Sequence, residues 1–412
     1  MNKFLKASAA TVALIAGAGA AMADCGIEEG SVRILSNDFD ALHVIATAAE
    51  TCASDTVEVT KNQTTEHKNI QVPALTTNPA SYTVAVIATN SIMPLLSADL
   101  VRPLDEYIEK WGQDLQEQQL IRIDGNVVAI AFMANAQHLF YREDILSENG
   151  IEVPTTYDEI IAAAKTLRDN GVMENPIAAG YKPGWDLAAE FVNTYLATGG
   201  EFFKDGTAEV DINNENGLKT LEALKAMSEY MSPDFVTYDS NAMYPLWEAG
   251  DTAIQIQWGS RTRQYADAEG PAPEVANVTR FAASPTLDGG TIPAAALWWD
   301  GFVIAKNISD EDAEASFRAM MVGISPETVA ENQEAAVWLV AGYEPTPAAI
   351  GVAADLEAGA RPYPMLPYMG LLHTALGDNL AEFMQGQESA EQALSDVSAA
   401  YMTAATEAGF IK

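Results

Sequence analysis

Residues 31–62, "SVRILSNDFDALHVIATAAETCASDTVEVTKN", alternate between two kinds of apolar pattern. The stretches 31–36 and 56–62 are short and contain several valines and isoleucines, which predicts strands, whereas 41–51 has the apolar spacing of a helix. A strand, a helix and a second strand in this order are typical of a parallel sheet covered by helices. This stretch therefore predicts an α/β fold.

The same alternation continues along the next part of the chain. We expect a helix at 67–77 and a further strand at 82–88. In a parallel sheet, ligand contacts gather in the loops beyond the carboxyl ends of the strands. The three loops concerned are polar, and the candidate ligand contacts in them are Asn37, Asp38, Glu66 and Asn90.

The second half of the chain also mixes helices and strands. Thr156 and Glu159 have the spacing of a capping box at the start of a helix, and Ser325 is placed to cap another. Residues 251–258 predict a strand that ends in a tryptophan, and 293–306 are extended again. No proline-rich or serine-rich linker separates two halves, so we expect two lobes to be joined by several crossing strands.

The N-terminus predicts export from the cell. Residues 1–23, "MNKFLKASAATVALIAGAGAAMA", have early lysines, an apolar middle and a small-x-small end, which is typical of a secretory signal peptide cleaved after Ala23.

The length and charge of the remaining chain limit its architecture and its partners. Removing 23 residues from 412 leaves 389. A single core stops growing at roughly 250–300 residues, so two lobes are expected. The formal charge of −36 repels nucleic acid and anionic membranes, and we exclude both as partners.

Cys25 and Cys52 are the two cysteines of the chain. An exported protein with two cysteines is expected to hold one disulfide. Because the helix at 41–51 runs back along the strand at 31–36, the residue before the strand and the residue after the helix meet at one edge. Closing this loop would stabilise the fold by about 3–4 kcal/mol.

The motifs of common catalytic sites are absent from the sequence. The four histidines are scattered without zinc-ligand spacing, and there is neither a nucleophile elbow nor a phosphate-binding glycine loop. We therefore expect no enzymatic activity, no metal and no cofactor. Acidic residues are so numerous that a pair of catalytic carboxylates, as in glycoside hydrolases, stays open as an alternative.

Aromatic residues gather beside polar residues at loops and strand ends. Flat apolar rings next to carboxylates, amides and arginine suit sugars, whose C–H faces stack on a ring while the hydroxyls form hydrogen bonds. A cationic solute such as a polyamine, or an amino-acid derivative, is the alternative, since ring faces also attract ammonium groups. The candidate residues in these clusters are Tyr181, Trp185, Trp258, Arg261, Trp298, Trp299, Asp300 and Tyr368.

Four segments resemble family 1 extracellular solute-binding proteins, in the order of that family. The first is "LFYREDILSENGIEVPTTYDEIIAAAKTL" at 139–167, and it is followed by "LWEAGDTAIQIQWGS", "GFVIAKNISDEDAEASFRAMMVGISPETV" and "MQGQESAEQALSDV". The resemblance implies a maltose-binding-protein-like sugar receptor of an ABC importer, a periplasmic monomer that delivers its ligand to the membrane permease. It also implies two α/β lobes, each a mainly parallel sheet flanked by helices, joined by a hinge of several segments.

The resemblance also assigns parts of the chain. Asn135 falls where maltose-binding relatives place a polar ligand contact. Adjacent residues of a strand point to opposite faces, and we expect Trp299, with Asp300, to line the cleft; the opposite register would place Trp298 there. The lobes implied are 24–134 with 286–345 (N-terminal) and 135–285 with 346–412 (C-terminal).

Overall fold

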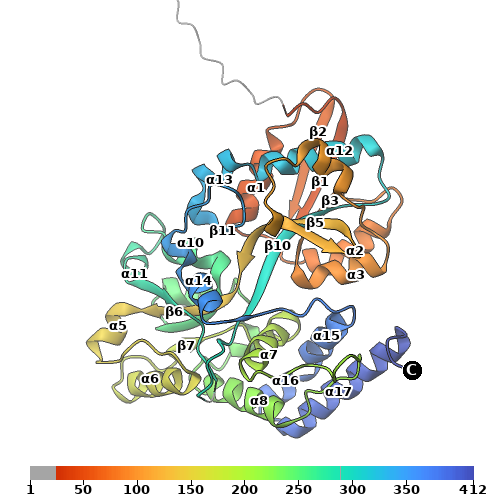
Figure 1. Cartoon of the computed structure of the whole chain (residues 1–412). Coiled ribbons are helices and arrows are strands. Elements are labelled where there is room, and N and C mark those ends of the chain that lie inside the picture. The colour runs from red at the N-terminus through yellow and green to blue at the C-terminus, as the bar shows by residue number, and fades with distance from the viewer. Residues whose placement is uncertain (1–24, 288) are drawn as a thin grey trace, which may run out of the picture.

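The protein has two lobes, each built on one β-sheet that is covered by helices (Figure 1). The computed structural model describes residues 25–287 and 289–412. The predicted signal peptide at 1–23 lies outside the described residues. The expected two-lobe α/β fold is confirmed.

The larger sheet, in the upper lobe of Figure 1, has the strand order β11-β5-β10-β3-β1-β2, with β4 on β5 and β12 on β10. Its strands are β1 (Gly30–Ser36), β2 (Val57–Gln63), β3 (Val84–Ala88), β4 (Leu120–Ile123), β5 (Asn126–Asn135), β10 (Ala296–Ile304), β11 (Val337–Trp338) and β12 (Arg361–Pro362). The helices of this lobe are α1 (Asp40–Glu50), α2 (His67–Thr76), α3 (Ile92–Ser97), α4 (Asp105–Trp111), α12 (Asp310–Gly323) and α13 (Pro326–Glu331).

The smaller sheet, in the lower lobe, has the strand order β7-β8-β6-β9. Its strands are β6 (Gln137–Arg142), β7 (Ile177–Ala178), β8 (Ile254–Trp258) and β9 (Thr279–Ala282). The helices around it are α5 (Glu143–Glu148), α6 (Tyr157–Asp169), α7 (Trp185–Ala197), α8 (Glu215–Ser228), α9 (Met243–Glu248), α10 (Thr262–Tyr265), α11 (Pro273–Ala276), α14 (Ile350–Glu357), α15 (Met369–Asn379), α16 (Ala381–Met384) and α17 (Ala390–Glu407). Short 3₁₀ helices are η1 (Thr89–Ser91), η2 (Glu117–Gln119), η3 (Phe235–Thr237), η4 (Gly259–Arg261), η5 (Gln333–Ala335) and η6 (Pro347–Ala349).

The expectation of mainly parallel sheets needs a correction. β1 is parallel to β2 and β3, as the strand–helix–strand pattern predicts, but β10 is antiparallel to both β3 and β5. In the smaller sheet only β7 and β8 are parallel, and β6 is antiparallel to both its neighbours. The reason is the hinge. A strand that arrives from the other lobe enters the sheet at the edge where β1 and β3 end, so it runs in the opposite direction.

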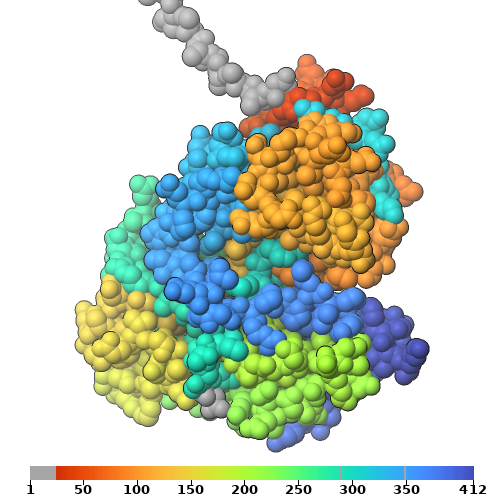
Figure 2. All heavy atoms as spheres, viewed as in Figure 1, coloured from red at the N-terminus to blue at the C-terminus, as the bar shows by residue number. Residues whose placement is uncertain are grey.

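Within residues 25–287 and 289–412, three connections carry the chain from one lobe to the other, and β12 pairs with the first two residues of β10 beside one of them. The first crossing joins β5 to β6, the second joins β9 to β10, and the third leads from β11 to α14, which packs against β6 and β9. Figure 2 shows the blue chain segment of the third crossing descending from the upper lobe to the lower one. The expected hinge of several segments is therefore present.

Helix α7 holds the first two crossings through buried amide and carboxyl groups. Gln137 Nε2 donates a hydrogen bond of 2.7 Å to Glu190 Oε1, and Asn193 Nδ2 donates to Gln137 Oε1. The Ala296 N–H donates to Asn193 Oδ1 at 3.0 Å. Glu190 and Asn193 are about 1% exposed, so these bonds replace contacts with water that both side chains lose on folding.

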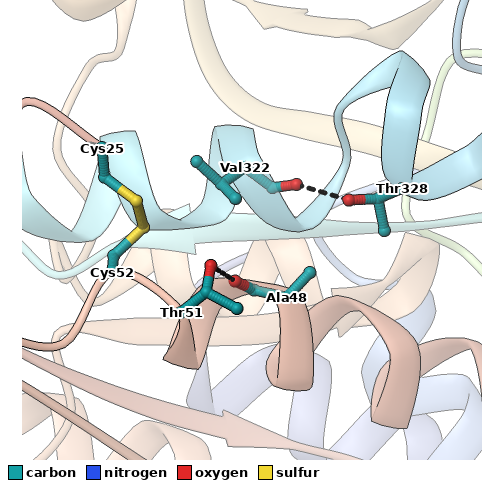
Figure 3. Close-up of a disulfide and its surroundings, with 6 residues drawn as sticks. All are labelled: Cys25, Ala48, Thr51, Cys52, Val322 and Thr328. Carbon is teal, nitrogen blue, oxygen red and sulfur yellow. Dashed lines mark hydrogen bonds between the residues drawn. A yellow bond between two sulfur atoms is a disulfide. The ribbon is translucent and has the colours of Figure 1, made fainter. Parts of the chain in front are cut away.

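The predicted disulfide between Cys25 and Cys52 is confirmed (Figure 3). It joins the segment before β1 to the second residue after α1, with the two Cα atoms 5.5 Å apart. The predicted N-caps are confirmed as well, although the second bond of the capping box is not formed, because Glu159 Oε2 accepts from Thr155 and not from the Thr156 N–H. The side chain of Thr156 accepts from the Glu159 N–H at 3.1 Å, and that of Ser325 accepts from the Thr328 N–H at 3.2 Å. Across residues 25–287 and 289–412, no helix combines the length and the apolar character needed to cross a membrane.

Candidate functional site

A cavity of about 370 Å³ lies between the two lobes. The first lobe contributes the loop after β1, the start of α2 and the middle of β10, and the second contributes the start of α7 and the end of β8. Eight of the predicted residues line it: Asn37, Glu66, Asn135, Trp185, Trp258, Arg261, Trp298 and Asp300. A cavity of similar volume beside the disulfide is lined by none of the predicted ligand contacts.

Five predicted site residues do not line the interlobe cavity, and we correct their placement. They are Asp38, Asn90, Tyr181, Trp299 and Tyr368. Asp38 is exposed and pairs with His43 at 2.6 Å, and Asn90 lies in η1 with its Oδ1 buried. Tyr181 is 1% exposed, and its hydroxyl donates to the Leu224 carbonyl.

Tyr368 is kept from the cavity by contacts within the second lobe. Its hydroxyl donates to the Thr207 carbonyl at 2.9 Å, and its ring packs edge-on against Phe203. Tyr368 and Tyr181 both lie in loops, and the sequence does not show whether an aromatic ring in a loop faces a cleft or the core. In both cases the ring packs into its own lobe.

The neighbouring indoles of β10 point to opposite faces, and Trp298 is the one that faces the cavity. Trp299 packs instead against the first-lobe core, and its backbone N–H donates to Thr89 Oγ1 at 2.9 Å. The expectation that Trp299 lines the cleft beside Asp300 is therefore wrong. In a strand, side chains two residues apart share a face, so Asp300 faces the cavity together with Trp298.

Three indoles form one wall of the cavity. The ring centroids of Trp185 and Trp258, of Trp185 and Trp298, and of Trp258 and Trp298 are each 5.7 Å apart. The ring of Tyr363 supports Trp298 from behind at 4.1 Å. The three separations of 5.7 Å lie within the range of attractive aromatic pairs, and Tyr363 packs still closer, so each ring restrains the orientation of the next.

His373 positions Trp185 from the second lobe. Burial lowers the pKa of His373 to about 3, so the imidazole is neutral. Its Nε2 lies 3.1 Å from the Trp185 carbonyl and therefore donates, while its Nδ1 accepts from the Tyr363 hydroxyl at 3.2 Å. Asn135, at the first crossing, is also held in place by hydrogen bonds. Its Nδ2 donates to Ser260 Oγ, and its Oδ1 accepts from the Ser260 N–H.

Charged groups of both signs face the indole wall. The Nζ of Lys68 lies 3.0 Å from the centroid of the Trp185 ring. Burial lowers the pKa of Lys68 to about 8, against the opposing attraction of Asp186 and Asp300. Burial also raises the pKa of Asp186 to about 6 and that of Asp300 to about 7, and Lys68 opposes both shifts.

Two further charged contacts close the sides of the cavity. The guanidinium of Arg261, from the second lobe, lies 5.5 Å from the ring of Phe39 in the first lobe. Burial lowers the pKa of Arg261 below its ordinary value. Lys182 and Asp239 form an ion pair of 3.0 Å within the second lobe.

Sequence reasoning missed several lining residues, among them Phe39, Lys68, Asp186, Asp239 and Ser240. Two of these had a usable signal. Asp186 directly follows Trp185 at the start of a helix, and Lys68 stands two residues after Glu66 of a polar loop. Among residues 25–287 and 289–412, no group of three or more His, Cys, Asp and Glu side chains is arranged to hold a metal ion.

The comparisons with known proteins agree with this architecture. A protein of Agrobacterium radiobacter K84, an ABC transporter solute-binding protein solved with ribitol, superposes with a TM-score of 0.77 at 18% identity, over 90% of this chain and 97% of that one. The maltose-bound MalE3 of T. maritima gives a TM-score of 0.77 at 16% identity, over 90% and 99%. At these identities the likeness concerns the fold.

Sequence comparison identifies the family. A probable ABC transporter-binding protein of Deinococcus radiodurans is 26% identical over 191 residues, which make up 45% of this chain and 44% of that protein. The match thus spans less than half of that relative. The family model of the bacterial extracellular solute-binding proteins matches residues 55–321, well over half of the chain. The chain therefore belongs to the bacterial extracellular solute-binding protein family.

Proposed function

We propose that this protein is the substrate-binding component of an ABC importer and that it binds a small sugar or sugar alcohol between its lobes. The observation that carries the proposal is the wall of three indoles facing carboxylates and amides within one interlobe cavity. The C–H face of a sugar can stack on an indole while its hydroxyls bond to polar groups. Solved relatives of the same fold carry ribitol, D-mannitol, maltose and laminaribiose, which supports this ligand class.

The hydroxyls of the ligand would bond to side chains from both lobes and from the crossings. Asn37 and Glu66 would act from the first lobe, and Asn135 and Asp300 from the crossing strands. The volume of about 370 Å³ is near the lower end of the roughly 300–1,000 Å³ usual for small-molecule pockets. This volume favours a ligand of one or two sugar units.

The mechanism we propose is closure of a hinge. A ligand that touches both lobes stabilises the closed arrangement by the difference between its affinities for the closed and open forms, and the permease would bind the closed form. The moving units would be 24–134 with 286–345 and 135–285 with 346–412. We further propose that the protein acts as a monomer in the periplasm after cleavage behind Ala23, and that it is no enzyme.

The test is binding by the mature protein to a panel of monosaccharides, disaccharides, polyols and polyamines, followed by intrinsic tryptophan fluorescence and calorimetry. We expect saturable binding of at least one sugar or polyol, with the ligand recovered unchanged. Binding of polyamines alone would refute the ligand class, and conversion of an oligosaccharide to shorter products would favour a glycoside hydrolase instead.

A further inference from the structure

An ammonium group of the protein itself occupies one side of the cavity. Lys68 extends from the start of α2 in the first lobe, and its Nζ lies 3.0 Å from the centre of the Trp185 ring in the second lobe. Asp186 adjoins Trp185 at the start of α7, and Asp300 lies on β10. All four residues line the same cavity.

The three residues around this ammonium form a site with the chemistry of a cation receptor. An indole face attracts a cation through its negative quadrupole, most strongly where water is excluded. Asp186 and Asp300 both attract Lys68, and burial raises the pKa of each carboxyl. Without a cation beside them, the two partly buried carboxylates would lose this favourable interaction.

We infer that Trp185, Asp186 and Asp300 form a binding site for a primary ammonium group, that Lys68 fills this site, and that Lys68 thereby determines specificity. With Lys68 in place, the cavity rejects cationic solutes, because their ammonium group would meet a position already taken by a like charge. The inference deepens the proposed function, on which it rests for the identification of the cavity as the binding site.

A second lysine of the cavity provides a matched control. Lys182 also lines the cavity, but it forms an ion pair of 3.0 Å with Asp239 and does not lie over an indole ring. Its removal changes the charge of the cavity by the same amount as the removal of Lys68. Only the removal of Lys68 leaves an uncovered indole between two carboxylates.

The experiment measures binding of n-propylammonium chloride. This amine has the three carbons and the ammonium group that the substitution Lys68→Ala removes from the side chain. Wild type, Lys68→Ala, Lys182→Ala and Lys68→Ala/Trp185→Leu are titrated at constant ionic strength and followed by tryptophan fluorescence and NMR. We expect Lys68→Ala to bind the amine about tenfold more tightly than wild type, and both other variants to remain near the wild-type level.

Two outcomes overturn the inference: Lys68→Ala gains no affinity for the amine, or Lys182→Ala gains as much. Circular dichroism of each variant verifies that it is folded. This test of the ammonium site is independent of the test of the proposed function, since the sugar and polyol panel is measured on the wild-type protein. Sugar binding by wild type without amine binding by Lys68→Ala would leave the proposed function standing and remove the ammonium site.

Discussion

Replacing Trp298 and, separately, Trp299 by leucine tests which indole contacts the ligand. The two residues are adjacent in β10, yet Trp298 faces the cavity and Trp299 packs into the first lobe. The two substitutions remove the same atoms from neighbouring positions. We expect Trp298→Leu to weaken ligand binding strongly, and Trp299→Leu to reduce stability while leaving the affinity within about twofold.

The magnitudes follow from the contacts of each ring. Trp298 pairs with Trp185, Trp258 and Tyr363, and each aromatic pair contributes about 0.5–1.5 kcal/mol, so its loss should lower the free energy of unfolding by roughly 1.5–4.5 kcal/mol. Loss of one stacking face should also weaken ligand binding by about 1–3 kcal/mol, or about 5- to 150-fold. Trp299 is partly buried and does not line the cavity. Its replacement by leucine should therefore lower only the free energy of unfolding, by about 1–3 kcal/mol.

Calorimetric titration with the sugar or polyol that wild type binds gives the affinity, and urea unfolding of the same samples gives the stability. Plotting one against the other separates the two effects, because a merely destabilised protein that is still folded keeps its affinity. The reasoning is refuted if Trp299→Leu loses as much affinity as Trp298→Leu, or if Trp298→Leu binds like wild type.

Three further predictions concern stability and the support of the site. Replacing Cys25 and Cys52, which are 27 residues apart in sequence, by alanine should lower the free energy of unfolding by about 2–4 kcal/mol in urea titrations; an unchanged midpoint would contradict this. Burial raises the pKa of Asp355 from its ordinary value of 3.8 to about 8, so the folded chain keeps a proton that the unfolded chain releases, and stability falls as pH rises across this range. Asp355→Asn should remove this fall and raise the free energy of unfolding at pH 8 by about 1–3 kcal/mol, whereas equal pH slopes for both proteins would refute the assignment. A methyl group at Gly377 would lie 2.4 Å from the Gly184 carbonyl oxygen, so Gly377→Ala should displace the start of α7, lower Tm and weaken ligand binding together. Differential scanning fluorimetry and calorimetry measure both effects, and unchanged binding would show that α7 stays in place.

Much of the fold could be predicted because its signals are local. Valine and isoleucine in short runs, the helix period of 41–51 and the hydroxyl caps at Thr156 and Ser325 all act over a few residues of chain. The disulfide followed from the same local geometry, since one strand and one helix bring its cysteines together. The direction of β10 could not be predicted in this way, because it depends on where the chain returns from the second lobe.

The candidate site could be predicted in part. Residues at strand ends, such as Asn37 and Trp258, were found because the carboxyl ends of β1 and β8 lie at the cavity. Tyr181 and Tyr368 were misplaced because an aromatic ring in a loop packs equally well inward or toward a cleft. Only the packing of α8 and of the loop before α8 around them makes the inward position the better one.

The sequence by itself determined the alternating α/β elements, the disulfide, the family and the presence of aromatic residues beside polar ones. It also determined that Trp298 and Trp299 point apart, because the period of a strand is a property of the backbone. The tertiary structure alone decided that Trp298, rather than Trp299, meets Trp185 at the cavity, and that Lys68 reaches Trp185 from the opposite lobe. Such contacts join residues more than a hundred positions apart, and they arise only when two separately packed cores are brought face to face by the hinge.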